Sequence, residues 1–361
     1  MLVCVEVGAP TAVDGRVDRL MDNLAAVRPT MICGVPRIFE KIRAAVITAV
    51  PRNGLKGRAA RWAFDVGSQA YPHRIEGRRP PLGLAVRYAA ADRLVYRRLR
   101  ALLGGRIRFL ISGSAKLSPQ IQRWFFSGGL LITEGYGVTE SAAVTFYNLH
   151  REPRFGTVGT IAPGSACRIA PDGEILLRGP GLMRGYHEDP ERTAEALRDG
   201  WLHTGDIGEL YEDGFLSVTD RKRDLIKTSG GKFVSPSDVE GAVVANCPYV
   251  AQVVVAGEGR GYISALLVLD RDAVLAWGRR HGHPEQAYAE LTRHPELRHV
   301  VQHGVDAANG HLAHWSRVKW YAVLDHEFTV EAGDVTPNMK VRRDRVLQRY
   351  AGVVDSLYAD A

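Results

Sequence analysis

Residues 199–240 read DGWLHTGDIGELYEDGFLSVTDRKRDLIKTSGGKFVSPSDVE, and this stretch decides how the rest of the chain is interpreted. The apolar runs around Glu212, Asp213 and Gly214 predict two strands, joined by a tight two-residue turn because Asp-Gly tolerates positive φ angles. The five consecutive charged residues at 220–224 predict a solvated connection, since such a run cannot be buried. Ser237 as an N-cap with Glu240 at the third helical position predicts the start of a helix.

The residues before this stretch alternate between predicted strands and helices. A strand at 3–7, a helix at 16–27 and a strand at 30–35 would form a βαβ unit with parallel strands. Residues 38–103 are rich in arginine and predict helices, which are either solvated or a binding surface; the solvated interpretation is favoured. Strands are expected at 106–111 and 130–133, a helix at 119–126, and turns at 112–115 and 134–140. Ligands bind where such turns leave the carboxyl ends of parallel strands.

The second half of the chain has a different pattern. Between residues 151 and 219, Gly and Pro turns separate short apolar segments every ~8–12 residues, which predicts a small barrel or sandwich. From residue 226 onward, helices and strands alternate, which predicts a separate α+β domain. The expected helices cover 237–246, 271–293 and 295–316, and the expected strands cover 252–256, 263–269 and 318–323.

Composition limits the function further. The 361 residues are 45% hydrophobic and carry a net charge of +7, yet residues 1–100 alone hold 18 Lys/Arg against 8 Asp/Glu. This basic segment favours a phosphate-rich ligand or an anionic membrane surface, because no nucleic-acid-binding module is visible. No apolar run approaches the ~18 residues of a membrane span, and the first residues lack the basic region of a signal peptide. We therefore expect a cytoplasmic protein, with possible peripheral contact at a membrane.

Cysteine and histidine usage points to no metal site. Cys4, Cys33, Cys167 and Cys247 are widely spaced and are expected to be reduced thiols. Seven histidines lie between residues 281 and 314, without cysteines or paired carboxylates at ligand spacing. They are expected to be surface residues of helices.

Two polar motifs carry recognisable chemistry. In the motif G-Y-G-V-T-E at residues 135–140, flanking glycines expose Tyr136 for stacking on a purine, Thr139 can donate to a phosphate oxygen, and Glu140 is a hard oxygen ligand for Mg²⁺. The alternative is a strand-to-helix turn in which Glu140 only favours the helix dipole. In H-T-G-D, the carboxylate of Asp206 can accept hydrogen bonds from two ribose hydroxyls, or it can simply occupy a turn.

Taken together, five motifs resemble those of the adenylate-forming (AMP-binding) superfamily. They are G-Y-G-V-T-E (135–140), H-T-G-D (203–206), D-R-K-R-D-L-I-K (220–227), S-G-G-K (229–232) and V-P-R-I-F-E-K (35–41), the last similar to a signature of long-chain fatty-acid–CoA ligases. The resemblance implies an α/β fold: part of a large domain at 1–150, with parallel-sheet α/β layers, and a small β-barrel subdomain at 151–219. A hinge at 220–225 and a small α+β C-terminal lid domain at 226–361 would follow.

The resemblance also assigns roles to individual residues. ATP and AMP would contact Ser114, Ala115, Glu134, Gly135, Tyr136, Gly137, Thr139, Asp206 and Arg221. Coenzyme A would contact Lys227, Ser229, Gly230, Gly231 and Lys232, and Arg223 would be the hinge residue about which the C-terminal domain turns. Lys340, Thr139 and Glu140 would be catalytic, with Glu140 binding Mg²⁺. Lys340 lies in V-T-P-N-M-K-V-R-R, where Asn338 is a mild departure from the family's pattern.

The implied activity is ATP-dependent ligation of a long-chain fatty acid to coenzyme A, through an acyl-adenylate. The superfamily's phosphate-binding loop, of the form [ST]-S-G-T-T-G-x-P-K-G, has no counterpart in the sequence. We therefore expect a truncated ligase covering the C-terminal three-fifths of a complete enzyme. The alternative is a non-catalytic nucleotide- or acyl-binding remnant, or one half of a split ligase that acts with an N-terminal partner chain or associates with itself.

Overall fold

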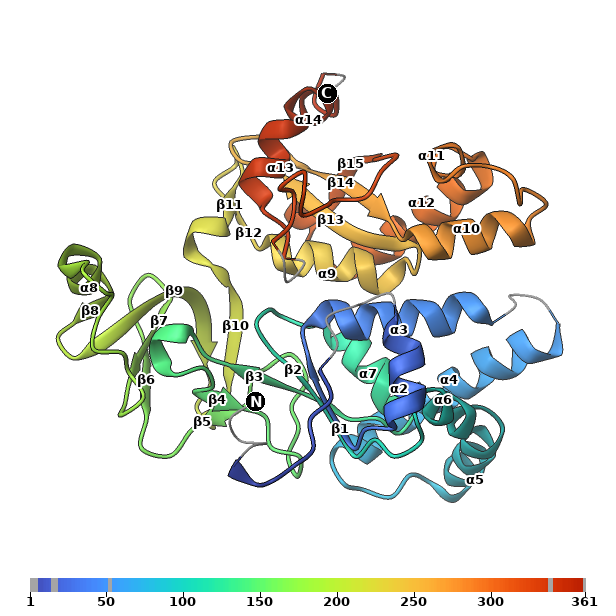
Figure 1. Ribbon diagram of the computed structural model, residues 1–361, viewed down its shortest axis with the longest axis horizontal. Helices are drawn as coiled ribbons and strands as arrows, with labels where there is room; N and C mark the ends of the chain where they lie inside the picture. Colours follow the sequence, from blue (N-terminus) through green and yellow to red (C-terminus); the bar gives the residue numbers. More distant parts are fainter. Residues whose placement is uncertain (1–5, 14–18, 51–53, 337–339, 360–361) are drawn as a thin grey trace.

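The computed structural model of the protein describes residues 6–13, 19–50, 54–336 and 340–359 (Figure 1). A parallel α/β layer lies at the lower right of the figure, an antiparallel sheet at the lower left, and the described residues from 226 onward lie above both. We call residues 226–361 the C-terminal unit. Among the described residues, no helix is long and apolar enough to cross a membrane.

The first sheet has the parallel core that the sequence predicts. Strands β1 (Met31–Gly34), β2 (Phe109–Ser112) and β3 (Ile132–Tyr136) are parallel neighbours in that order. Two short antiparallel strands, β4 (Phe146–Tyr147) and β5 (Thr160–Ile161), extend the sheet beyond β3. The predicted strand at 3–7 lies mostly outside the described residues, and Val7 is in a turn. Strand β3 runs to Tyr136, so residues 134–136 are strand and not turn as predicted.

Helices of the first 130 residues cover this sheet. They are α2 (Leu20–Val27), α3 (Pro36–Ala49), α4 (Leu55–Ile75), α5 (Leu82–Ala91), the π-helical turn η2 (Asp92–Tyr96), α6 (Arg97–Leu102) and α7 (Pro119–Ser127). The shared core contains Phe39 and Ile42 of α3, Phe125 of α7, Leu110 of β2 and Ile132 of β3. The predicted helical character of residues 38–103 is thereby confirmed.

The second sheet carries the hairpin of the opening motif. Its strands run in the order β10 (Leu216–Arg221), β9 (Trp201–Leu210), β7 (Glu174–Arg178), β6 (Ala166–Ile169), with β8 (Leu197–Arg198) also paired to β9 and α8 (Pro190–Ala196) beside it. The turn differs from the predicted two-residue loop. Three residues, 212–214, separate Tyr211 from Phe215, whose carbonyl accepts the Tyr211 N–H at 2.9 Å, and only Gly214 among the three has a positive φ, +82°.

The C-terminal unit is a three-stranded sheet between helices. Its elements are β11 (Ile226–Lys227), β12 (Phe233–Val234), α9 (Pro236–Asn246), β13 (Val250–Ala256), β14 (Ile263–Leu269), α10 (Arg271–Arg280), α11 (Tyr288–Leu291), α12 (Pro295–Asn309), the 3₁₀ turn η5 (His314–Ser316), β15 (Val318–Val323), α13 (Arg343–Arg349) and α14 (Ala351–Ser356). Strand β14 is antiparallel to β13 and parallel to β15. Helices α9, α10 and α12 share a core on one face of this sheet, and α13 packs on the other.

Three details of this unit correct the sequence-based expectations. The helix expected at 271–293 is divided, because Gly282 adopts φ +86° after α10 and Pro284 follows. The helix expected at 295–316 ends at Asn309. The N-cap of α9 lies two residues earlier than predicted: Ser235 is the N-cap and accepts the Asp238 N–H at 3.2 Å, with Pro236 in the first helical position.

The charged connection at 220–224 is only partly solvated. Arg221 and the 3₁₀ turn η4 (Lys222–Asp224) contain exposed residues. Asp220, however, accepts the Ser237 N–H at 2.9 Å and the Ser235 hydroxyl at 3.1 Å, so its carboxylate caps α9 from outside the helix. Glu240 does not cap α9 as predicted; it makes two hydrogen bonds with Arg343, at 2.6 and 3.0 Å.

Candidate active site

Three of the residues singled out by sequence meet where the two sheets adjoin. Tyr136 ends β3, Asp206 lies in β9, and Arg221 ends β10 opposite Asp206 in register. The Tyr136 hydroxyl donates to Oδ2 of Asp206 at 2.8 Å, and Nε of Arg221 lies 3.4 Å from Oδ1. Motifs about 70 residues apart in sequence therefore form one polar cluster, which we call the Tyr136–Asp206 cluster.

Burial and the neighbouring groups shift the pKa of Asp206 in opposite directions. Burial raises the pKa of Asp206, and the Tyr136 hydrogen bond and the cations of Arg221 and Lys340 oppose that rise. Burial also raises the pKa of the Tyr136 hydroxyl, with the nearby Asp206 charge adding to it, so this hydroxyl stays protonated and donates.

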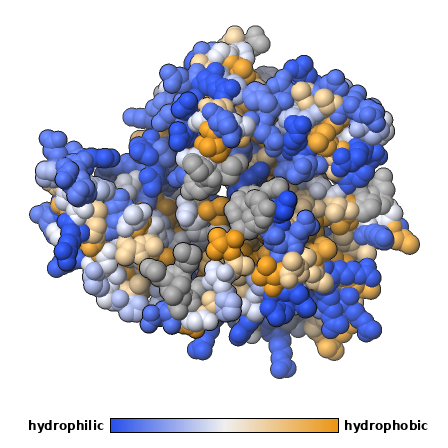
Figure 2. Space-filling model, in the orientation of Figure 1, coloured by the Kyte–Doolittle hydropathy of each residue, from blue (hydrophilic) through white to orange (hydrophobic). Residues whose placement is uncertain are grey.

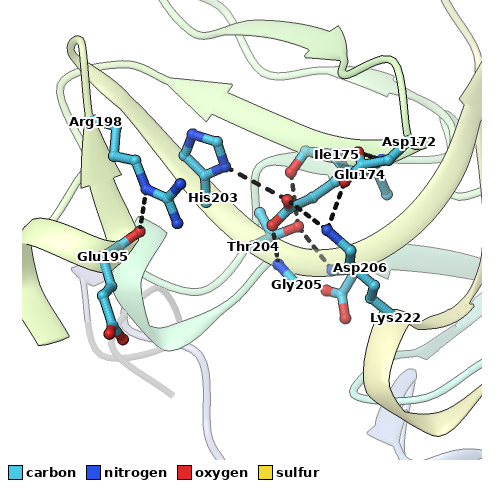
Figure 3. Close-up of polar contacts among 10 residues, drawn as sticks. All are labelled: Asp172, Glu174, Ile175, Glu195, Arg198, His203, Thr204, Gly205, Asp206 and Lys222. Carbon is cyan, nitrogen blue, oxygen red and sulfur yellow. Dashed lines mark hydrogen bonds and ion pairs between the residues drawn. The ribbon is translucent and has the colours of Figure 1, made fainter.

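The backbone around Asp206 is held by residues that sequence reasoning did not select (Figure 3). The Thr204 hydroxyl donates to the Ile175 carbonyl at 2.7 Å and accepts the Asp206 N–H at 3.1 Å. Glu174 accepts the Gly205 N–H at 2.9 Å and lies 3.6 Å from the Lys222 ammonium. Thr204 was visible in the H-T-G-D motif itself, whereas Glu174 comes from the neighbouring strand and could be found only from the pairing of β7 with β9.

The turn after β3 presents Thr139 and Glu140. Gly137 is required there, because a Cβ atom would lie 1.5 Å from the Ala143 carbonyl oxygen. Thr139 begins the 3₁₀ turn η3 (Thr139–Ser141) and is exposed, and the Tyr186 hydroxyl donates to Oε1 of Glu140 at 2.8 Å. Tyr186 was also missed by sequence reasoning.

Glu140 suits Mg²⁺ as a single protein ligand. Mg²⁺ usually keeps several water ligands and takes one or two carboxylates together with phosphate oxygens of a substrate. Among the described residues, no group of three or more His, Cys, Asp or Glu side chains could hold a metal ion without such a substrate. The single half-buried carboxylate of Glu140 therefore fits a metal that arrives with a nucleotide.

The turn after β2 lies next to β3. Ser114 and Ala115 are exposed, and Ser114 has φ +69°, a conformation that non-glycine residues adopt mainly where surrounding structure imposes it. A Cβ on Gly113 would lie 3.5 Å from the Gly135 carbonyl oxygen, so this turn and the Tyr136 turn are adjacent. The carboxyl ends of β2 and β3 thus meet at one edge, as the parallel arrangement predicted.

The side chain of Glu134 in β3 is buried and connects β3 to the segment that follows β2. Its buried carboxylate accepts the Leu117 N–H at 2.9 Å, and burial raises its pKa from 4.5 to about 7. At 5% exposure, Glu134 has little surface available for contact with a nucleotide.

The residues expected to bind coenzyme A lie apart from the Tyr136–Asp206 cluster, on the C-terminal unit. Ser229 N–H donates to the Arg260 carbonyl at 2.9 Å, and the Lys227 N–H donates to Glu258 at 2.9 Å. Lys232 lies over the exposed ring of Trp315, 5.3 Å from its centroid. Residues 229–232, including Gly230 and Gly231, are exposed. In this orientation burial raises the pKa of Asp206 and the charge of Lys340 opposes that rise, while Ser229 and Lys232 contact their own unit. Arg223 is exposed beside Asp224.

Comparison with protein families gives two matches. Residues 1–187 match the family model described as AMP-binding enzyme, and residues 223–361 match the model described as AMP-binding enzyme C-terminal domain. The Mycobacterium bovis protein named long-chain-fatty-acid–CoA ligase FadD15 is 36% identical over 347 residues, which cover 95% of this chain and 57% of that protein. Long chain acyl-CoA synthetase 2 of Arabidopsis thaliana is 30% identical over 96% of this chain and 54% of its own length.

Solved structures agree on the fold. The adenylation domain of a carboxylate reductase from Mycobacterium chelonae superposes with a TM-score of 0.65 at 22% identity, over 95% of this chain and 48% of that one. The A-PCP didomain of a carboxylic acid reductase from Segniliparus rugosus, solved with AMP, gives 0.64 at 23% identity, over 97% and 44% of the two chains. These likenesses confirm the predicted fold class. The chain spans about half the length of the relatives it matches.

Proposed function

We propose, from the premise that this chain belongs to the family of AMP-binding enzymes, that it carries the nucleotide- and thiol-handling parts of an ATP-dependent long-chain fatty acid–CoA ligase. In that reaction a fatty-acid carboxylate attacks the α-phosphate of ATP and displaces pyrophosphate. The thiol of coenzyme A then attacks the acyl carbon and displaces AMP. The observation that carries the proposal is the Tyr136–Asp206 cluster, in which Asp206 contacts both the Tyr136 hydroxyl and the Arg221 guanidinium.

The proposed roles are those that the family resemblance implies, and the contacts among Tyr136, Asp206 and Arg221 support the roles of these three residues. Asp206 and Arg221 would bind the ribose hydroxyls, and Tyr136 would contact adenine. Thr139 would donate to a phosphate, and Lys340 would bridge the carboxylate and the α-phosphate. Glu140 would hold Mg²⁺, which would neutralise phosphate charge during adenylation. The remaining proposed contacts are Ser114, Ala115, Glu134, Gly135 and Gly137 with the nucleotide, and Lys227, Ser229, Gly230, Gly231 and Lys232 with coenzyme A.

We also propose the division into functional parts. Residues 1–150 and 151–219 would form the available portion of the large domain, and residues 226–361 the lid. The connection at 220–225 would be the hinge, with Arg223 as its pivot. The exposure of Arg223 and of the η4 turn supports this, because a moving connection must stay solvated.

Binding of a non-hydrolysable acyl-adenylate, a long-chain acyl sulfamoyl adenosine, tests the proposed site on the chain as it stands. Asp206→Asn is expected to weaken binding about 10- to 100-fold, because a hydrogen bond to a charged group contributes ~1.5–3 kcal/mol. Asp213→Asn is a matched control, since Asp213 is an exposed carboxylate at the hairpin turn. Calorimetry would measure both affinities. Failure of the unmodified chain to bind, or equal affinity for the two variants, would contradict the proposal.

We further propose that the chain contacts anionic membrane through α5, η2 and α6. Four apolar residues on this run are strongly exposed: Leu82 (82%), Val86 (62%), Leu94 (54%) and Leu102 (55%). The exposed arginines between them are Arg87, Arg93, Arg97 and Arg98. The single acid of the run, Asp92, is paired with Arg100 at 2.8 Å. Hydrophobic and hydrophilic atoms are interspersed at the lower right of Figure 2, where these helices lie in Figure 1. Such a face suits a negatively charged lipid surface.

Flotation with lipid vesicles tests this contact. Arg93→Gln combined with Arg98→Gln is expected to weaken binding to anionic vesicles roughly tenfold or more, since each basic residue near such a surface contributes about 1 kcal/mol. Arg178→Gln combined with Arg279→Gln removes the same charge from exposed positions on β7 and α10 and should change little. Equal binding by both variants would contradict the proposal, and so would equal binding to zwitterionic vesicles or burial of this face in a dimer of the chain.

A further inference from the structure

The motif V-P-R-I-F-E-K at 35–41 has no place in the proposed nucleotide site. It forms the first turns of α3, with Pro36 in the first helical position. Phe39 and Ile42 are fully buried in the core beneath the helix. Arg37 and Lys41 are four positions apart, so they share a face of α3, and this face is not the one that carries Phe39 and Ile42. The motif therefore anchors the helix by one face and presents two cations on another.

These two cations meet the C-terminal unit. Nη1 of Arg37 donates to the carbonyl of Ala251, and Nη2 lies 4.0 Å from Oδ2 of Asp270. Nζ of Lys41 lies 3.8 Å from Oδ2 of Asp272. Asp270 is itself the N-cap of α10 and accepts the Ala273 N–H at 3.0 Å. The two carboxylates at the start of α10 thus lie against the two cations of α3.

A second group of contacts joins α9 to the segment around α7. Nζ of Lys116 lies 2.7 Å from Oδ1 of Asp238, and the Asn246 side-chain amide donates to Gln120 at 2.9 Å. Ala245 of α9 belongs to the same buried cluster as Phe39. The C-terminal unit therefore contacts both α3 and the segment around α7, in the orientation in which the charge of Lys340 acts on Asp206.

We propose that Arg37 and Lys41 are positioning residues, which hold the C-terminal unit in the orientation that directs Lys340 to the Tyr136–Asp206 cluster. The inference rests on the proposed function, in which the unit must later turn to bring residues 229–232 to the same site. That turn would separate α10 from α3 and break both contacts. Partly exposed ion pairs contribute only about 0–1 kcal/mol each, which suits a contact that forms and breaks in every cycle.

The proposal can be tested on the full chain without substrate, by reversing the charge of Lys41 and then exchanging the charges of Lys41 and Asp272. Lys41→Glu places a carboxylate opposite Asp272 and should favour release of the C-terminal unit. The observable is the rate of tryptic cleavage at Arg221, Lys222 or Arg223, identified by fragment mass. We expect several-fold faster cleavage, because the rate follows the population of the open form when opening is fast. Combining Lys41→Glu with Asp272→Lys should restore a rate close to that of the unmodified chain.

Controls separate positioning from folding. Lys56→Glu makes the same charge change at an exposed position of α4 and should leave cleavage unchanged. If Lys41→Glu lowers the thermal midpoint, Lys41→Gln is used instead, with small-angle scattering as a second measure of domain separation. Unchanged cleavage and scattering in the Lys41 variants, or failure of Asp272→Lys to restore Lys41→Glu, would overturn the proposal. Neither result depends on acyl-adenylate binding, so failure here is distinguishable from failure of the proposed function.

Discussion

Lys340→Ala is expected to slow acyl-adenylate formation by about 10²–10³-fold, the usual cost of removing one group that stabilises charge in a transition state. Negative charge builds on the α-phosphate as the carboxylate attacks, and an ammonium fixed nearby stabilises that state more than the ground state. The positive charge of Lys340 acts on Asp206, which is proposed to bind the ribose of the same nucleotide. The measurement is pyrophosphate release by an enzyme completed with the N-terminal part of the Mycobacterium bovis relative.

The second half-reaction, thioester formation, should respond differently to the same substitution. Thioester formation from synthetic acyl-AMP and coenzyme A should be nearly unaffected by Lys340→Ala, because the lysine would then have moved away. Gly231→Leu should do the reverse, by obstructing the approach of the thiol arm. Gly231 has φ +75° and open space around its Cβ position, and Gly214 is matched in both respects, so Gly214→Leu controls for backbone strain. Equal slowing of both half-reactions by Lys340→Ala would mean that the lysine is structural.

Glu134→Gln is expected to stabilise the protein at pH 8 and to change little at pH 4. Burial raises the pKa of Glu134 to about 7 in the folded chain, against 4.5 without burial. Between these values the folded state binds the proton and the unfolded state does not, so the stability of the native protein falls as the pH rises from about 4.5 to about 7. Above that range the ionised carboxylate costs about 3 kcal/mol.

Glutamine removes this cost while its carbonyl oxygen can still accept the Leu117 N–H. The thermal midpoint of the variant should therefore exceed that of the unmodified chain by several degrees at pH 8, with the difference disappearing toward pH 4. Glu209→Gln, on an exposed position of β9, is the control and should show no such dependence. A midpoint difference that is the same at both pH values would disprove the titration of Glu134.

The sequence predicted the parallel core and most helices because their signals are local. Pro36 and Pro119 each stand in the first position of a helix, and apolar periodicity marks the residues that follow. The N-cap of α9 was misplaced because Ser235 and Ser237 both fit the pattern. The choice depends on Pro236 within the helix and on Asp220, which takes the Ser237 N–H from outside it. The prediction of one long helix at 271–293 was wrong because it did not allow for the positive φ that Gly282 adopts.

The candidate site was only partly accessible from sequence. Tyr136, Asp206 and Arg221 were found from their motifs, but no local pattern indicates that Tyr136 donates a hydrogen bond to Asp206. Tyr186 contacts Glu140, and Glu174 accepts the Gly205 N–H. Both contacts join segments that are distant in sequence, so they depend on the whole fold. The same is true of Arg37 and Lys41, since their carboxylate partners lie more than 200 residues away in the chain.

The pairing of Glu240 with Arg343 fixes the segment that contains Lys340 to helix α9. Arg343 is half-buried, lies three residues after Lys340, and is tied by two hydrogen bonds to α9. The same α9 is capped by Asp220, from the connection that joins the unit to the rest of the chain. These contacts link the connection at 220–225 through α9 and Arg343 to the segment that contains Lys340. For the proposed role of Lys340, we expect a substitution at Glu240 to change the position of the ammonium without changing any residue proposed to contact the nucleotide.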